Sequence, residues 1–327
     1  MTQLRGWLPV AALVAVLAAA PLSTSNNYYM DIIVQIFMWG AAATAWNIVG
    51  GYAGQFSLGH AAFFGIGAYT SSLLFIASGF SPWLGMLAGG ALAAIFALII
   101  GYLSIRLRGP FFTLATIALA EVLQILAIYW RDLTGGGSGV LIPFRPGLAA
   151  FMFESKRTYA YVGLGFLLAV LAVAYAIERS RLGYYLVAIR EEEEAARALG
   201  VPVLRMKLVA IIVSAFFTSL VGTFYAQYTL WLEPPYAFSL ELSIQFALMV
   251  IIGGLGTWVG PLLGAVLITP LNVFLRAWFG AAASGLYLVF YGIILVVVVL
   301  FMRQGIAVET RLAFRRWVTM RRRLASG

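Results

Sequence analysis

The sequence predicts an all-α, polytopic membrane protein with about ten transmembrane helices (range 8–10). Hydrophobic residues make up 63% of the chain and charged residues only 10%, whereas these classes form about half and about a quarter of soluble domains. A bilayer core about 30 Å thick needs about 20 apolar residues for each helix that crosses it. The 327 residues therefore have room for eight to ten such helices with short connections.

Ten apolar segments provide the predicted spans. In chain order they are Leu8–Leu22, Tyr29–Val49, His60–Ser78, Trp83–Ile105, Phe111–Trp130, Tyr159–Ile177, Leu208–Tyr228, Leu240–Ile252, Trp258–Ala277 and Gly285–Met302. The first and the eighth are the shortest. Together they predict a transmembrane domain over residues 1–302, followed by a basic tail over residues 303–327.

The positions of the basic residues set the predicted orientation, because Lys and Arg concentrate on the cytoplasmic side of membrane proteins. Ten spans place both termini in the cytoplasm, together with residues 106–109 and 178–207, and leave residues 131–158 outside. Every basic cluster then faces the cytoplasm, including the arginines of the tail: Arg303, Arg311, Arg315, Arg316, Arg321, Arg322 and Arg323. We therefore interpret the net charge of +9 as membrane topology rather than nucleic-acid binding.

The first segment also has the order of a signal peptide. Arg5 precedes an apolar run from Leu8 to Ala20, and small and polar residues follow. Pro21 stands directly after the alanines where cleavage would fall. This favours an uncleaved first span, with a cleaved leader as the alternative.

Glycines interrupt two of the apolar regions in a related way. The stretch Ile48–Gly54 has a loose echo in Ile251–Gly256. Paired breaks of this kind indicate a transport pathway, because non-helical backbone at membrane depth needs protein or water around it. The alternative is that the glycines permit close helix packing. The candidate hinge or packing glycines are Gly50, Gly51, Gly54, Gly59, Gly253, Gly254 and Gly256.

Several kinds of chemistry are excluded by what the sequence lacks. The only lysines are Lys156 and Lys207, and neither follows a glycine, so a phosphate-binding GxxxxGK[ST] loop is impossible. With no cysteine and one histidine, thiolate metal sites and a Ser-His-Asp arrangement have no support, and we expect no cofactor and no metal. If the protein uses nucleotide hydrolysis, another chain must supply the ATPase.

The charged segment 178–207 is the best candidate for contact with a soluble partner. Good helix formers run from Arg190 to Leu199, and Gly200 with Pro202 supplies a stop. This predicts a short helix at the membrane surface. Its Glu191–Glu194 and Arg197 would face water or a partner, and Ala195 and Ala196 would form a shallow surface that fits a cleft. The alternative is a solvated loop that contacts nothing.

Two sets of motifs then resemble known transporters. Glu194–Gly200 resembles the first half of the EAA loop by which permeases of ABC importers engage their ATPases, although the usual downstream Ile-x-Leu-Pro is replaced by Ala210–Val213. Asn47–Tyr69 resembles the hallmark of branched-chain amino acid permeases of the LivM type. Further similar motifs follow in the same order: Arg106–Phe112, Thr134–Gly136 and Ile252–Thr257.

The resemblance implies an importer in the bacterial inner membrane. This chain would pair with a second, related permease, and two cytoplasmic ATPase subunits and a periplasmic substrate-binding protein would complete the complex. Residues 178–207 would be the coupling loop, with Glu191, Glu194, Ala195, Ala196, Arg197 and Gly200 as its coupling residues.

Five polar residues are candidates for the translocation path. Gln55, Ser57 and His60 follow the first glycine break and could form transient hydrogen bonds to a solute, although a structural hydrogen bond explains the histidine equally well. Glu121 is the one acid near the middle of a span, and Gln124 lies one turn away on the same face. A charge there should face the bundle interior, a partner or water, or be a protonated carboxyl bonded to a neighbouring helix.

The primary hypothesis is therefore a permease subunit of an ATP-driven importer for branched-chain or similar hydrophobic amino acids. The alternative is a secondary transporter or channel driven by an ion gradient, for a small polar solute such as urea or an amide, with Glu121 as proton carrier. Uptake in vesicles that lack any ATPase separates the two. A membrane-embedded enzyme has no catalytic cluster to support it.

Overall fold

The computed structural model describes residues 12–104, 107, 109–279 and a few isolated positions between 289 and 309. Within them, eight helical segments are long and apolar enough to cross a membrane: Asn27–Tyr52, His60–Ser78, Pro82–Leu103, Pro110–Tyr129, Lys156–Glu178, Val203–Thr229, Pro234–Gly253 and Gly260–Phe279. The predicted all-α, multi-span class is confirmed. The predicted orientation of the termini stays a prediction.

The first and last predicted spans are not among these eight segments. The first is a shorter apolar helix, Ala12–Leu22, which ends in the 3-10 turn η1, Ala20–Leu22. The last, Gly285–Met302, lies mostly outside the described residues, as does the basic tail.

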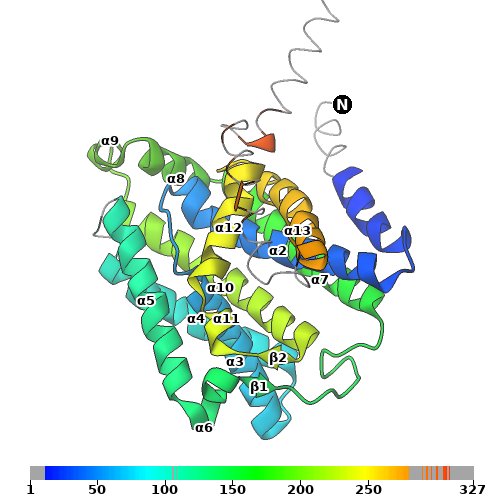
Figure 1. Cartoon of the computed structure of the whole chain (residues 1–327). Coiled ribbons are helices and arrows are strands. Elements are labelled where there is room, and N and C mark those ends of the chain that lie inside the picture. The colour runs from blue at the N-terminus through cyan, green and yellow to red at the C-terminus, as the bar shows by residue number, and fades with distance from the viewer. Residues whose placement is uncertain are drawn as a thin grey trace, which may run out of the picture.

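The elements follow one another along the chain in Figure 1. They are α2 (Asn27–Asn47), η2 (Ile48–Tyr52), α3 (His60–Ser78), α4 (Pro82–Ser104), α5 (Pro110–Tyr129), α6 (Arg131–Thr134), η3 (Gly136–Ser138), β1 (Val140–Leu141), α7 (Lys156–Glu178), α8 (Arg181–Glu191), α9 (Glu193–Ala198), α10 (Val203–Thr229), β2 (Trp231–Leu232), α11 (Pro234–Ala237), α12 (Leu240–Gly253) and α13 (Gly260–Phe279).

The centre of the bundle is built on α2, α3 and α10. Helix α10 packs on α3, α4 and α2, and α2 also packs on α7, α12 and α13. Small residues make this possible, as usual between helices in membranes. A Cβ on Gly67 would overlap the backbone of Ser219, and one on Gly222 would overlap the backbone of Phe64. The Thr223 hydroxyl, on α10, donates to the carbonyl of Gly67 at 3.0 Å.

The two ends of the bundle differ in structure. At one end, the antiparallel pair β1–β2 joins Val140 to Leu232 and Leu141 to Trp231. This pair and α6 belong to the connections around residues 130–155 and 230–239. At the opposite end, α8 and α9 project beyond the spans (Figure 1). This second end carries the segment predicted to meet a partner.

The predicted single helix over Arg190–Leu199 is wrong in one respect. Glu192 is extended, with φ −156° and ψ 104°, so α8 ends at Glu191 and α9 begins at Glu193. The bend turns α9 back toward the start of α10, where the side chain of Glu193 reaches Lys207. That long-range ion pair competes with a continuous helix, and helix propensity is a weak prior against such contacts.

Candidate functional site

Helix α9 is held on α10 by buried charge. The Nζ atom of Lys207 donates to Glu193 at 2.7 Å, and only 5% of the lysine side chain is exposed. Arg197 pairs with the other carboxylate oxygen of Glu193 at 2.9 Å. Because a buried lysine is costly without a partner, Glu193 fixes α9 relative to the start of α10.

An apolar contact also holds α9 against α8 and α10. Ala196 is buried against Ile189 of α8 and Val203 of α10. The predicted coupling residue Ala196 therefore faces inward in this chain and does not contribute to an outer surface. Its small side chain allows α9 to lie close to both neighbouring helices.

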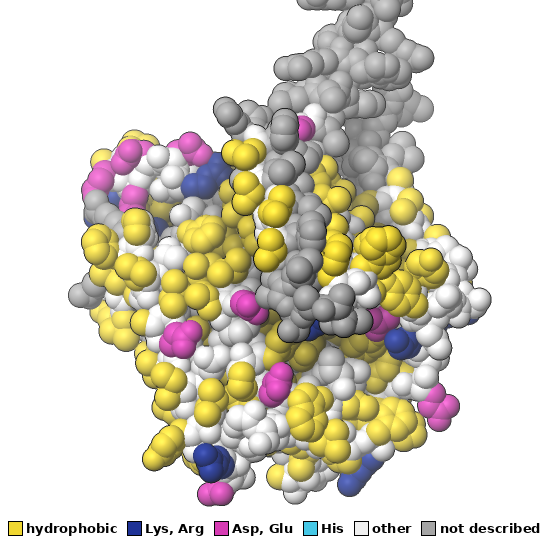
Figure 2. All heavy atoms as spheres, in the orientation of Figure 1, with side chains coloured by type: hydrophobic (Ala, Val, Ile, Leu, Met, Phe, Trp, Pro, Cys, Tyr) yellow, Lys and Arg dark blue, Asp and Glu magenta, His cyan; other side chains and the backbone are white. Residues whose placement is uncertain are grey.

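The outer side of α9 is exposed. The predicted coupling residues on this side are Glu191, Glu194, Ala195, Arg197 and Gly200. Figure 2 shows acidic side chains gathered over α8 and α9. Leu199 adds an apolar side chain that is 87% exposed at the end of α9.

Gly200 is required for its backbone conformation. Its φ is +84°, in the left-handed region that favours glycine, while nothing lies within 4 Å of the position a Cβ would take. The turn therefore has space for a side chain, but its positive φ would strain any residue other than glycine.

Hydrogen bonds connect α8 to both glycine breaks. Arg190 donates from Nη1 to the carbonyl of Gly51 at 2.9 Å. The amide of Asn47 then bridges the two breaks, donating to the carbonyl of Thr257 at 2.9 Å and accepting from the N–H of Gly256 at 3.0 Å. The two sequence echoes, about 200 residues apart, thus meet in space.

Glu178, at the end of α7, completes this arrangement. Its Oε2 accepts from the hydroxyl of Tyr52 at 3.0 Å and from the N–H of Trp258 at 3.1 Å. We call the assembly the glycine junction and define it as Asn47, Gly51, Tyr52, Glu178, Arg190, Gly256, Thr257 and Trp258. It ties α7 and α8 to the ends of α2 and α12.

The candidate glycines mostly serve close packing or special backbone conformations. A Cβ on Gly51 would overlap Asn47 and reach within 2.6 Å of the Gly256 nitrogen, and one on Gly253 would overlap the carbonyl of Gly260. Gly50 packs on the Trp46 ring and Gly59 on the Thr116 carbonyl. Positive φ values occur at Gly54, Gly254 and Gly256. These contacts favour the close-packing alternative for the echoed breaks.

His60 is enclosed by hydroxyl groups. Ser214 gives its hydrogen to the carbonyl of Ala45 at 2.6 Å, so it must accept from Nε2 of His60 at 2.8 Å. Nδ1 of the ring then accepts from the Ser57 hydroxyl at 2.9 Å. The ring is completely buried and both nitrogens are paired. This favours the structural hydrogen bond over a contact between His60 and the solute.

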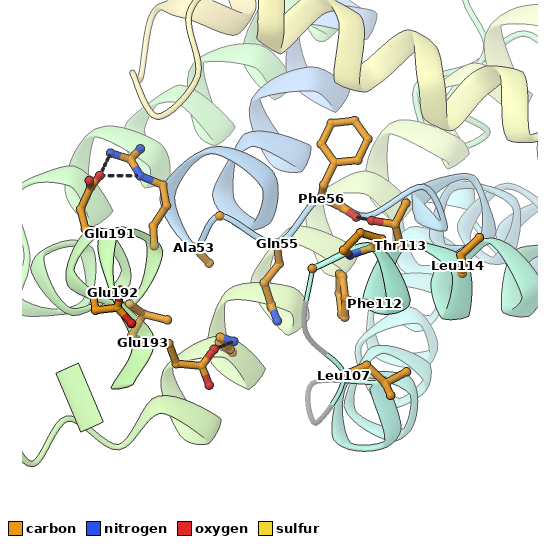
Figure 3. A pocket seen from close by; sticks show the side chains of 16 residues that line it. Ala53, Gln55, Phe56, Leu107, Phe112, Thr113, Leu114, Glu191, Glu192 and Glu193 are labelled. Carbon is orange, nitrogen blue, oxygen red and sulfur yellow. Dashed lines mark hydrogen bonds and ion pairs between the residues drawn. The ribbon is translucent and has the colours of Figure 1, made fainter. Parts of the chain in front are cut away.

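Gln55 lies at a cavity beside α9. The cavity has a volume of about 650 Å³ and lies between residues 53–56, the start of α5 and the α8–α9 bend. The Gln55 side chain extends into it (Figure 3), and its Oε1 atom is buried with no hydrogen-bond partner among the described residues. The Oε1 atom of Gln55 therefore lacks a polar partner at this end of the bundle.

Glu121 and Gln124 lie elsewhere, half-buried on α5. Nε2 of Gln124 donates to the carbonyl of Pro235, in α11, at 3.0 Å. The five predicted pathway residues are thus not brought together. The sequence analysis placed Glu193 on the outward side with the rest of Glu191–Glu194, whereas its side chain faces Lys207. It assigned no structural contact to Lys207 or to the junction residues Asn47, Glu178 and Arg190. One signal was present, since Asn47 is an isolated amide directly before a glycine break.

Comparison with known proteins assigns the chain to a family. The profile of the branched-chain amino acid transport system / permease component family matches residues 28–299. The high-affinity branched-chain amino acid transport system permease protein LivM of Salmonella typhimurium is 28% identical over 288 residues, covering 81% of this chain and 67% of that protein. LivM of Escherichia coli is 28% identical over 82% of this chain and 68% of its own length. The autoinducer 2 import system permease protein LsrC of an Enterobacter species is 27% identical over 62% of this chain and 59% of its own length. The chain therefore belongs to the family of permease components of branched-chain amino acid transport systems.

Proposed function

We propose that this chain is the transmembrane permease subunit of an ATP-binding-cassette importer that moves branched-chain or similar hydrophobic amino acids across the bacterial inner membrane. Its partners are a second, related permease, two cytoplasmic ATPase subunits and a periplasmic binding protein. Family membership and the names of the relatives support the class of protein and solute. The observation that carries the proposal is the exposed face of α9 on a seat fixed by Glu193 and Lys207.

In the proposed mechanism, the ATPase subunits hold α9 and move it when ATP closes them. Because Glu193 and Lys207 fix α9 on α10, and Ala196 packs on α8, these helices move with it. Arg190 passes the displacement to the carbonyl of Gly51. Asn47 and Glu178 pass it to the turn after α12. The bundle then switches between outward and inward access as packed elements shift together.

The coupling role predicts that Glu194→Lys and Gly200→Pro separate ATP hydrolysis from uptake. Glu194 is exposed on α9, so its reversal changes the docking surface without changing the core. Proline holds φ near about −65° and cannot adopt the +84° of Gly200. We expect uptake to fall about tenfold, equivalent to about 1.4 kcal/mol of lost coupling, while membrane insertion stays intact.

The test uses the complete complex in proteoliposomes and measures uptake and ATP hydrolysis in parallel. Asp132→Lys, on α6 at the opposite end of the bundle, is the matched charge control and should leave both rates unchanged. Normal uptake and normal solute-stimulated hydrolysis in both α9 variants would contradict the docking role. Uptake driven by an ion gradient in vesicles without ATPase subunits would instead favour a secondary transporter.

A further inference from the structure

A second cavity lies between α2, α11, α12 and α13, remote from α9 in sequence and lining. Its volume is about 280 Å³, and its wall includes Glu241, Gln245, Asn272 and Arg276. Charged residues make up only 10% of the whole chain. An acid, a base and three amides, since Gln35 of α2 also lines it, are therefore a strong local concentration of polarity around one cavity.

The polar residues recur at helical spacing. Glu241 and Gln245 lie one turn apart on α12, and Thr269, Asn272 and Arg276 follow one face of α13. Glu241 lies in the first turn of α12 and Arg276 in the last turn of α13, and charges at such positions are expected to face protein or water rather than lipid. The two helices thus direct their polar faces to a common space.

Thr269 provides an independent sign of a missing ligand. Only 2% of this residue is exposed, it lines the cavity, and its hydroxyl has no hydrogen-bond partner among the described residues. Most buried polar groups are paired, so this hydroxyl calls for an explanation. The next residue, Pro270, lies inside α13 and also frees the carbonyl of Val266 from the helical ladder.

Apolar side chains also line the cavity. Trp39 of α2 and Ile244 and Leu248 of α12 line the same cavity. The cavity wall therefore includes a cation, an anion, neutral hydrogen-bonding groups and an aliphatic or aromatic surface. A small α-amino acid has the complementary groups, namely a carboxylate, an ammonium and an apolar side chain. At about 30 Å³ for each water molecule, the space holds about nine waters, which suits a solute of that size.

We propose that this cavity binds the solute as a zwitterionic α-amino acid during its passage. Arg276 receives the carboxylate and Glu241 the ammonium, and the hydroxyl of Thr269 donates to the carboxylate. The aliphatic side chain lies against Trp39 and Leu248. This assignment rests on the proposed function and adds the solute contacts that Ser57 and His60, sealed in the bundle, do not provide.

The sequence contains no cysteine, so one introduced thiol reports on one position of this chain. Gln245→Cys places the thiol in the cavity wall. Gly137→Cys, in η3 and outside the cavity lining, is the control, since nothing lies within 4 Å of its Cβ position. The complete complex in proteoliposomes is treated with a methanethiosulfonate reagent, and mass spectrometry follows the labelling of this subunit. Leucine at about four times its dissociation constant should slow labelling at position 245 about fivefold, as 1 + [L]/Kd, and leave position 137 unchanged.

Two analogues test the charges. Leucinamide lacks the carboxylate and 4-methylpentanoate lacks the ammonium, so both should protect the thiol less than leucine does. Both charge variants are made in the Gln245→Cys chain. With Arg276→Gln, leucine and leucinamide should protect the thiol equally. With Glu241→Gln, leucine and 4-methylpentanoate should protect it equally. Arg131→Gln, on α6, should preserve the difference between all three.

The outcomes separate this site from the proposed function. A complex that imports no amino acid contradicts the function itself. Import of leucine without protection at position 245, equal protection by leucinamide, or a thiol that no reagent reaches would each overturn the amino-acid site alone.

Discussion

Helices α2 and α5 are both apolar spans of similar length, yet their surroundings are opposite. The segment Asn27–Tyr52, which contains α2, has a mean hydropathy of 1.6, and 78% of its most apolar stretch is buried. Helix α5 is more apolar, at 2.1, but only 22% of the corresponding stretch is buried. In this protein the more hydrophobic helix is the less buried one. The difference follows from the solvent, since lipid favours apolar side chains on the outside as much as the core does.

The residues of the two helices explain the contrast. The C-terminal half of α2 carries small and polar residues, including Gly40, Thr44 and Asn47. The Thr44 hydroxyl donates a hydrogen bond to the carbonyl of Gly40 at 2.6 Å. Such residues let neighbouring helices approach closely. Helix α5 instead exposes large apolar side chains: Phe111, Leu114, Val122, Ile125, Leu126 and Tyr129. Packing therefore depends on α2, and α5 is left to contact lipid or another chain.

The largest effect is expected at the break after α2. In Gly51→Ala, the new methyl group would overlap Asn47 and the Gly256 nitrogen, so the glycine junction must open. We expect a loss of about 3 kcal/mol of unfolding free energy, at the upper end for overpacking, and little folded protein. Thermal unfolding of the purified protein in detergent measures this.

Gly165→Ala on α7 is the matched control. No atom lies within 4 Å of its Cβ position, so alanine should be neutral or stabilise the helix by up to about 1 kcal/mol. If Gly51→Ala and Gly165→Ala unfold at the same temperature, close packing at Gly51 does not contribute to stability as we expect.

A smaller effect is expected from the amide that bridges the two breaks. Asn47→Leu leaves the carbonyl of Thr257 and the N–H of Gly256 without their partner. We expect destabilisation by about 2 kcal/mol, since two partly buried groups lose their partner at about 1 kcal/mol each, the lower end of the cost for a buried group. Uptake should also fall more than ATP hydrolysis, because the turn after α12 is no longer tied to α2.

The corresponding change on α5 is Gln124→Leu, which removes one hydrogen bond to the carbonyl of Pro235. It should cost no more than about 1 kcal/mol and leave the ratio of uptake to hydrolysis unchanged. If Asn47→Leu and Gln124→Leu lower the ratio of uptake to ATP hydrolysis equally, the glycine junction does not transmit motion.

The sequence predicts the spans well because each is a local run of apolar residues. It also predicts the turn at Gly200, where a local stop signal and a positive φ coincide. The bend at Glu192 was missed because its cause, the ion pair between Glu193 and Lys207, lies beyond any local pattern. Likewise, Ser57 and His60 were predicted as pathway residues, and only the distant Ser214 shows how the ring is satisfied.

The glycine junction also depends on contacts between residues far apart in the chain, which a sequence pattern does not show. The echo between Ile48–Gly54 and Ile251–Gly256 was visible in the sequence, but two interpretations remained open. Asn47 joins the two breaks through its hydrogen bond to Gly256, and the contacts of the glycines themselves favour close packing. No periodicity connects residues so far apart in the chain. The polar cavity at Glu241 and Arg276 is hidden in the same way, because its walls come from separate helices.

The smallest effect on the single chain is expected on the outer face of α5. Ile125 is largely exposed, so Ile125→Ala should change the unfolding free energy of the isolated subunit by no more than about 0.5 kcal/mol. Ile48→Ala, at the buried break after α2, removes the same atoms and should cost about 2 kcal/mol, at the lower end for a buried isoleucine. If a second permease covers α5, Ile125→Ala will lower the yield of assembled complex while the subunit itself stays as stable as before. A large loss of stability in the isolated subunit would instead mean that α5 packs within this chain, and the contrast with α2 would disappear.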